Sequence, residues 1–310
     1  MIYLNKKIIN GPWGGGNKSV ASIAKELERR SIPFTFRLTS DVKIIFCFDP
    51  RPNSEGLWYQ NFVNHKIRYG SKIVQRVGDV GTHSKPELTQ LLRNIIESKM
   101  TDLFIFPSEW AKNYLDLEIT NYKIIKNMPK EIFYKNKKNN VLCSEKNKTI
   151  SVVTHHWSTN PKKGFSVYEK IGSYIQGNKD IKLTYIGRHP NNFNTKGISI
   201  KRPMSDSELS IELPKHDVYF TASVEEAGAN HVLEAIAAGL PIVYSSKGGS
   251  IPEYCNKFGI PFNEDPIESI KQCYYNNKEI FKNISSFNEN INIMSKKYVD
   301  ILEEELKVFK

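Results

Sequence analysis

The sequence predicts an α/β fold built from two Rossmann-like, doubly wound domains. Short apolar segments of strand length, such as 103–106, alternate along the chain with segments of helical periodicity. A polar tract rich in Lys and Asn, 135–148, lacks any periodicity and has the composition of an interdomain linker. The length of 310 residues is sufficient for two separate hydrophobic cores. We therefore expect domains at 1–140 and 149–285, followed by a C-terminal helix at 286–310.

The composition narrows the class of protein. The sequence has no apolar run near 18 residues and no secretory segment at its start, so we expect a cytoplasmic protein without a membrane-spanning helix. Four scattered cysteines without CxxC spacing indicate a reducing compartment and no zinc site; they are Cys47, Cys143, Cys255 and Cys273.

The net charge of +11 lies entirely in the first half of the chain. Residues 1–150 hold 25 Lys and Arg against 14 Asp and Glu, whereas residues 151–310 hold 19 of each. Such asymmetry suits an anionic partner: a phosphorylated glycolipid at a membrane surface, an acidic polysaccharide or nucleic acid. A bias toward Lys and Asn that only keeps the surface hydrated is the alternative.

The first domain opens with a strand, a glycine loop and a helix. Apolar residues at 2–4 and 8–9 predict the strand, a glycine run that includes Gly15 and Gly16 predicts the loop, and apolar residues at helical spacing predict a helix at 19–30. This is the opening of a Rossmann unit, although GxGxxG is absent and a flexible turn is the alternative. Further strands are predicted at 34–38, 43–48, 72–77 and 103–106, and helices at 56–64 and 87–99. The strand at 103–106 is followed by a helix capped by Ser108.

Asp79 and His83 are candidate catalytic residues of the first domain. They follow the predicted strand 72–77, where a doubly wound sheet places its ligand loops. A single histidine in a loop is more often merely solvated, so this prediction depends on position alone.

The second domain begins with a predicted strand at 150–154 that leads into His155 and His156. Lys163 and Gly164 follow in a loop, where the ammonium group suits a phosphate and the glycine allows the loop to close over it. Packing with solvent contact is the alternative for the two histidines. A strand is predicted at 182–186, and helices at 166–174 and from 206, the latter capped by Ser205.

The most informative segment is 218–253. A buried strand at 218–220 is followed by a turn, a helix at 231–238, a second strand at 242–244 and a second glycine turn. In this arrangement a helix N-terminus and a glycine loop face one crevice, which suits a diphosphate. We expect Asn230 to cap the helix. The residues expected to present backbone groups to the ligand are Gly228, Ala229, Asn230 and His231.

Two carboxylates in this segment, Glu226 and Glu234, stand eight positions apart. Glu234 lies in an otherwise apolar helix, where an ionised carboxylate is costly unless it finds hydrogen-bond donors. Sugar hydroxyls are suitable donors. The alternative is that Glu225, Glu226 and Glu234 are ordinary surface charges that interact favourably with the helix dipole.

This segment resembles the signature of the retaining GT-B glycosyltransferases of family 4, Glu-x7-Glu in the context S-x-x-E-G-x-G-x-x-x-L-E-A-x-A-x-G-x-P-V-V. The matching residues are Ser223, Glu226, Gly228, Leu233, Glu234, Ala235, Ala237, Gly239, Pro241 and Val243. The match departs at Ala227 and Ala229, where glycine and an aromatic-glycine pair are common in the family. The departure bears on which sugar is bound, whereas the carboxylate spacing is intact.

The resemblance implies a GT-B fold, with the two domains facing a central cleft and the C-terminal helix returning to the first domain. It implies that the first domain binds the acceptor and the second binds the nucleotide-sugar donor. It places Glu226 close to the transferred sugar and Glu234 on the ribose. It also implies that Lys163 binds the donor diphosphate. The family's arginine before this lysine is missing here, and the residues that occupy its region are His155, His156 and Ser158. Gly15 and Gly16 correspond to a family loop near the donor phosphates or the acceptor.

The reaction implied is sugar transfer from a UDP- or GDP-linked donor with retention of configuration. The sequence contains no DxD motif, so we expect neither a metal nor another cofactor. The acceptor is expected to be a glycan or a lipid-linked molecule, and peripheral contact with an anionic membrane would use the basic first half. Three alternatives stay open: an inactive sugar-nucleotide-binding protein, a nucleotide-sugar epimerase, and a nucleic-acid-binding protein that uses the basic half. The last lacks any recognisable nucleic-acid-binding motif, so no nucleic acid is expected.

Overall fold

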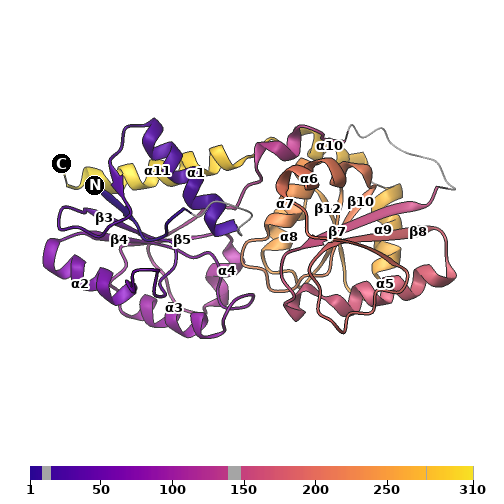
Figure 1. Cartoon of the computed structure of the whole chain (residues 1–310), viewed down its shortest axis with the longest axis horizontal. Helices are drawn as coiled ribbons and strands as arrows, with labels where there is room; N and C mark the ends of the chain where they lie inside the picture. Colours follow the sequence, from indigo (N-terminus) through magenta and orange to yellow (C-terminus); the bar gives the residue numbers. More distant parts are fainter. Residues whose placement is uncertain (9–14, 139–147, 277, 310) are drawn as a thin grey trace. The chain divides into compact units, whose positions relative to one another are not determined.

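A computed structural model describes residues 1–8, 15–138, 148–276 and 278–309. It divides into two compact units, each described by itself (Figure 1). Unit 1 comprises Met1–Asn127 and Ile291–Lys310, and unit 2 comprises Met128–Asn290. No helix in the described part of the chain is both long and apolar enough to cross a membrane.

Unit 1 contains a six-stranded parallel sheet with the strand order β2-β1-β3-β4-β5-β6. Because the connections from the middle of the sheet run in opposite directions, β1 and β3 form the topological switch point. The elements are β1 (Ile2–Leu4), α1 (Gly15–Arg29), β2 (Phe34–Thr35), β3 (Ile44–Cys47), α2 (Tyr59–Tyr69), β4 (Lys72–Arg76), α3 (Glu87–Glu97), β5 (Leu103–Phe106), α4 (Glu109–Tyr114), β6 (Tyr122–Ile124) and α11 (Ile291–Lys307).

The C-terminal helix α11 is part of unit 1, where it packs along α1 (Figure 1). The ring of Tyr298 lies 5.8 Å from that of Phe46 on β3, and Arg30 forms an ion pair of 2.6 Å with Asp300. Tyr298 is buried, so this last helix completes the hydrophobic core of the first unit.

Unit 2 contains a second six-stranded parallel sheet, with the order β12-β11-β10-β7-β8-β9. Its switch point lies between β7 and β10. The elements are η1 (Glu131–Tyr134), β7 (Ile150–His156), η2 (Pro161–Lys163), α5 (Phe165–Gly177), β8 (Ile181–Gly187), β9 (Ile198–Lys201), α6 (Asp206–Glu212), η3 (Leu213–Lys215), β10 (Val218–Thr221), α7 (Asn230–Ala237), β11 (Ile242–Ser245), α8 (Ser250–Cys255), β12 (Gly259–Phe262), α9 (Pro266–Tyr275) and α10 (Lys278–Ser286).

Helices cover both faces of this sheet. Successive residues of its strands are apolar and point to opposite faces, so each face must be buried. On β10, Tyr219 packs with α7 and α8, whereas Phe220 packs with α5 and α9. Both cores are fully buried, so the sheet holds the carboxyl ends of its strands in a fixed arrangement.

The tract predicted as a linker packs on unit 2 where it begins. Lys138 donates its backbone N–H to the carbonyl of Ala238 at 3.0 Å, and its ammonium group pairs with Asp217 at 2.9 Å. The remainder of the tract, 139–147, which includes Cys143, lies outside the described residues.

Candidate functional site

Three loops meet at the carboxyl edge of the unit 2 sheet, after β7, β10 and β11. The loop after β10 is fastened to the loop after β11 by backbone hydrogen bonds from Glu225 N to Lys247 O (3.0 Å), from Glu226 N to Gly248 O (3.2 Å) and from Ser250 N to Glu226 O (2.7 Å). The loop after β7 joins them through Val224 N and Lys162 O at 2.9 Å. The backbone beneath Glu226 is therefore held on both sides.

Glycine is required where these loops touch. Gly164 has φ +78°, and a Cβ there would lie 2.4 Å from the carbonyl oxygen of Ala222. Gly249 has φ +71°, and its Cβ would lie 2.5 Å from the carbonyl oxygen of Glu226. Any other side chain would combine an unfavourable backbone conformation with a collision, so both positions need glycine.

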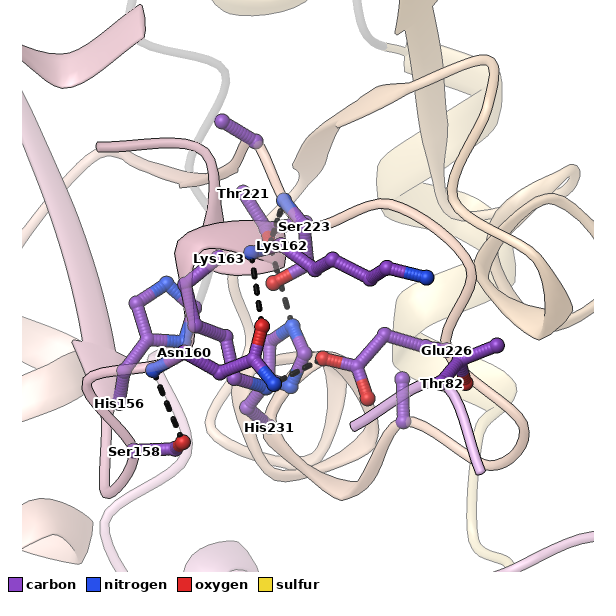
Figure 2. Close-up of polar contacts among 12 residues, drawn as sticks. Thr82, His156, Ser158, Asn160, Lys162, Lys163, Thr221, Ser223, Glu226 and His231 are labelled. Carbon is purple, nitrogen blue, oxygen red and sulfur yellow. Dashed lines mark hydrogen bonds and ion pairs between the residues drawn. The ribbon is translucent and has the colours of Figure 1, made fainter. Parts of the chain in front are cut away.

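Lys163 and Glu226 form an ion pair at the centre of this edge (Figure 2). Both side chains are buried, with 11% and 10% of their surface exposed. The neighbouring pair, Lys162 and Glu225, repeats the contact at the surface, with 37% and 42% exposed. Two adjacent pairs thus have the same sequence spacing and very different access to water.

Glu234 is buried in α7 and is held by His155, whose Nε2 lies 2.9 Å from the carboxylate oxygen Oε2. Tyr219 Oη accepts a hydrogen bond from the backbone N–H of His155 and lies 3.2 Å from Nδ1 of the ring. Burial raises the pKa of Tyr219 well above its usual value, so its hydroxyl keeps its proton. The hydroxyl is within donating distance of both Nδ1 and the carbonyl oxygen of His155, at 3.2 and 3.4 Å. A carboxylate only accepts hydrogen bonds, so Nε2 of His155 donates to Glu234.

His156 and His231 lie beside each other at the same edge, with ring centroids 5.2 Å apart. Thr221 Oγ1 lies 3.1 Å from Nε2 of His231, and Tyr168 Oη lies 2.7 Å from Nε2 of His156. The two rings are thus oriented by hydroxyl groups of β10 and α5. In the described ranges, no three His, Cys, Asp or Glu side chains converge in a way that would hold a metal ion.

Helix α7 begins one residue earlier than predicted, and Asn230 is not its cap. The N-cap is Ala229, which has the extended backbone of that position, and no side chain of its own caps the helix. Ser250 Oγ instead accepts a hydrogen bond from the backbone N–H of Ala229 at 3.2 Å. Asn230 and His231 are the first residues of the helix, next to the loop that contains Gly228.

The other predicted site residues lie in unit 1. Gly15 and Gly16 are in the first turn of α1 rather than in a loop, because the helix begins before the predicted residue 19; the preceding residues 9–14 lie outside the described part. Asp79 and His83 lie between β4 and α3, and Oδ1 of Asp79 accepts a hydrogen bond of 3.4 Å from Thr82.

Two supporting residues were not among the predicted site residues. Tyr219 and Ser250 fix His155 and the start of α7, respectively. Tyr219 could have been predicted from the alternation of side chains along β10, because Tyr219 and Thr221 lie on one face of the strand and Phe220 lies on the other. Nothing in the sequence pointed to Ser250.

No protein-family model and no curated protein sequence matches this chain. Solved structures do match. HepE from Anabaena in complex with UDP superposes with a TM-score of 0.70 at 14% identity, covering 98% of this chain and 99% of that one. A glycosyltransferase from Rickettsia africae gives 0.67 at 16% identity, covering 99% and 98%. Sucrose-phosphate synthase from Thermosynechococcus elongatus gives 0.64 at 12%, covering 99% of both chains.

These similarities confirm the predicted fold class: the chain has the two parallel-sheet α/β fold of GT-B glycosyltransferases. At such low identity they establish the fold alone. The function must be argued from the edge of the unit 2 sheet.

Proposed function

We propose that this protein is a retaining, metal-independent glycosyltransferase whose unit 2 binds a nucleotide diphosphate sugar. The observation that carries the proposal is the buried pair of Lys163 and Glu226, which lies at the switch point of unit 2, with Glu234 on the adjoining helix. Open α/β sheets bind ligands at such switch points.

Lys163 suits the diphosphate of the donor. Negative charge develops on that group as the anomeric bond breaks, and a buried ammonium group stabilises it more strongly than an exposed one would. The N-terminus of α7, at the same edge, adds the partial positive charge of its first turn. In the structure Lys163 pairs with Glu226, so a bound diphosphate would compete with that carboxylate for the ammonium group.

Glu226 is the residue we assign to the sugar. Its backbone is fastened by hydrogen bonds on both sides, so its carboxylate can change partners without movement of the loop. When Lys163 turns to the diphosphate, Glu226 becomes available to position the sugar or to stabilise positive charge at its anomeric carbon. Glu234, held by His155, is assigned to the ribose hydroxyls.

UDP is the first nucleotide to test, because HepE was solved with UDP and with UDP-glucose, and a pneumococcal O-GlcNAc transferase, GtfA, with UDP and GlcNAc. GDP stays a candidate. For the acceptor we propose a glycan or lipid-linked hydroxyl, bound by unit 1. We also propose a cytoplasmic location. Because the positive charge lies in the first half of the chain, we propose that this half makes peripheral contact with an anionic membrane.

The test is thermal shift with UDP, GDP and their sugars in the presence of EDTA, followed by a transfer assay. Glu226→Ala should abolish transfer while leaving the far-UV spectrum unchanged, and Glu225→Ala, its exposed neighbour, should transfer normally. NMR of the product should show the anomeric configuration of the donor. Normal turnover by Glu226→Ala would contradict the assigned role. Nucleotide binding without any transfer would instead indicate an inactive sugar-nucleotide-binding protein.

A further inference from the structure

A cavity of about 210 Å³ lies at the carboxyl ends of β1 and β3 in unit 1. These two strands form the switch point of that sheet, where α/β folds place ligands. The cavity is thus a second candidate site, independent of the edge in unit 2. Its lining residues are Leu4, Asn5, Lys6, Lys7, Phe36, Asp49, Arg51, Pro52, Asn53 and Ser54.

The polar side chains of the wall are largely engaged with one another. Asn5 donates to the carbonyl of Asp49 at 2.6 Å and accepts from the backbone N–H of Phe48 at 2.6 Å. Arg51 donates twice to Asp49, at 2.9 and 2.7 Å, and Lys7 pairs with Glu55 at 2.7 Å. The wall is therefore built before any ligand arrives.

Lys6 is different, because it forms no ion pair with any residue that the structure describes. Its ammonium group lies against the first turn of α1, where a Cβ added to Gly16 would be 3.0 Å from Nζ. That turn contains no acidic residue, and the N-terminus of a helix is its positive end. Burial lowers the pKa of Lys6; Asp49 opposes the change, and the charges of Arg76 and Arg51 add to it.

Arg76, at the end of β4, is a second cation without a carboxylate partner within the described ranges. It is 5% exposed, and its guanidinium group lies over the ring of Phe48 at 5.8 Å. A second carboxylate, Asp79, acts on the charge of Arg51. Lys6 is half-buried with Asp49 as an opposing charge, and Arg76 is buried without a carboxylate partner in the described ranges. A bound anion would offset the cost of holding these two cations close together.

We propose that this cavity, lined by Lys6 and Arg51, binds a phosphate group on the acceptor. The inference rests on the proposed function, in which unit 1 receives the acceptor. A phosphate dianion suits an ammonium group that has no ion pair and lies beside a helix N-terminus. The group belongs either to a soluble sugar phosphate or to a lipid phosphate at a membrane surface.

The first test is isothermal titration of the full-length protein with inorganic phosphate and with glucose 1-phosphate at constant ionic strength. Lys6→Met should weaken binding by about tenfold or more, as expected for the loss of a charge-assisted hydrogen bond. Lys25→Met is the control, because Lys25 is an exposed residue of α1 that does not line the cavity; it should bind as the wild type does. Absence of phosphate binding, or an equal effect of the two substitutions, would overturn the inference.

Two further measurements separate this inference from the proposed function. UDP affinity should be unchanged in Lys6→Met; a parallel loss of UDP binding would assign these cations to the donor and overturn the proposal. Phosphate binding that depends on Lys6 should persist in Glu226→Ala. If transfer and UDP binding are never observed while this phosphate binding is, the proposed function fails and the anion site stands.

Vesicle flotation distinguishes the two sources of phosphate. Vesicles of phosphatidylcholine with and without phosphatidic acid are compared for the wild type, Lys6→Met and Lys25→Met. If only Lys6→Met fails to bind vesicles that contain phosphatidic acid, the ligand is a lipid phosphate. If all three proteins bind those vesicles equally and binding of glucose 1-phosphate depends on Lys6, the ligand is a soluble sugar phosphate. Either result supports the phosphate site, and loss of both Lys6-dependent effects contradicts it.

Discussion

The adjacent pairs Lys163–Glu226 and Lys162–Glu225 allow a controlled measurement of how burial changes the contribution of an ion pair to stability. Lys163→Met removes the partner of a carboxylate that is only 8% exposed, whereas Lys162→Met removes the partner of one at the surface. Methionine keeps most of the length and volume of lysine, so packing changes little in either variant.

The structure gives an expected magnitude for each. Breaking a buried pair costs about 3–5 kcal/mol, because it leaves an uncompensated charge. About a tenth of each side chain of the Lys163–Glu226 pair is exposed, so we expect about 3 kcal/mol, the lower end of that range. An exposed pair contributes about 0–1 kcal/mol. The difference between the two variants should therefore be about 2–3 kcal/mol.

The assay is urea denaturation of both variants and the wild type, followed by circular dichroism. Two compact units need not unfold together, so the free energy is taken only from the transition that the substitutions shift. Titration with UDP on the same proteins should show a loss of affinity of about tenfold or more in Lys163→Met and little change in Lys162→Met. A difference in stability below about 1 kcal/mol would refute the argument from burial.

Three other predictions concern contacts seen in one unit each. In a double-mutant cycle, His155→Ala and Glu234→Ala should show a coupling energy of about 1–3 kcal/mol by urea denaturation; additive effects would mean that the hydrogen bond contributes nothing. Gly164→Ala should lower the melting temperature, whereas Gly177→Ala, which has no atom within 4 Å of the new Cβ, should leave it unchanged or raise it; equal effects would contradict the strain argument. Arg29, the last residue of α1, and Arg30, just after it, lower the pKa of Glu26 to about 2, with burial opposing them, so the stability lost in Glu26→Gln should be full above pH 4.5 and should vanish as the pH falls toward 2. A constant difference across that range would refute it.

The sequence predicted the fold because its strands are apolar runs of the right length and its helices have apolar residues at the correct spacing. The same periodicity placed Glu226 after a strand and Glu234 in a helix, as observed. These features are local, so a window of a few residues contains them.

The contacts that build the site are not local. Glu226 and its partner Lys163 are far apart in the chain, as are Glu234 and His155, and only the order of strands in the sheet brings them together. The prediction that Asn230 caps α7 was wrong, because Asn230 is already the first residue of the helix and Ala229 is its cap. The N–H of Ala229 donates to Ser250 on the next helix. A sequence window cannot show a group supplied by another element.

The position of α11 in unit 1 has a consequence for how the chain is made. Unit 2 is continuous in sequence, so every residue of its core has been synthesised before α11 appears. Unit 1 must wait, because Tyr298 and the rest of α11 are synthesised only after the whole of unit 2. The core that α11 covers can therefore be completed only after unit 2 has been synthesised, although residues 1–127 of unit 1 precede it in the chain.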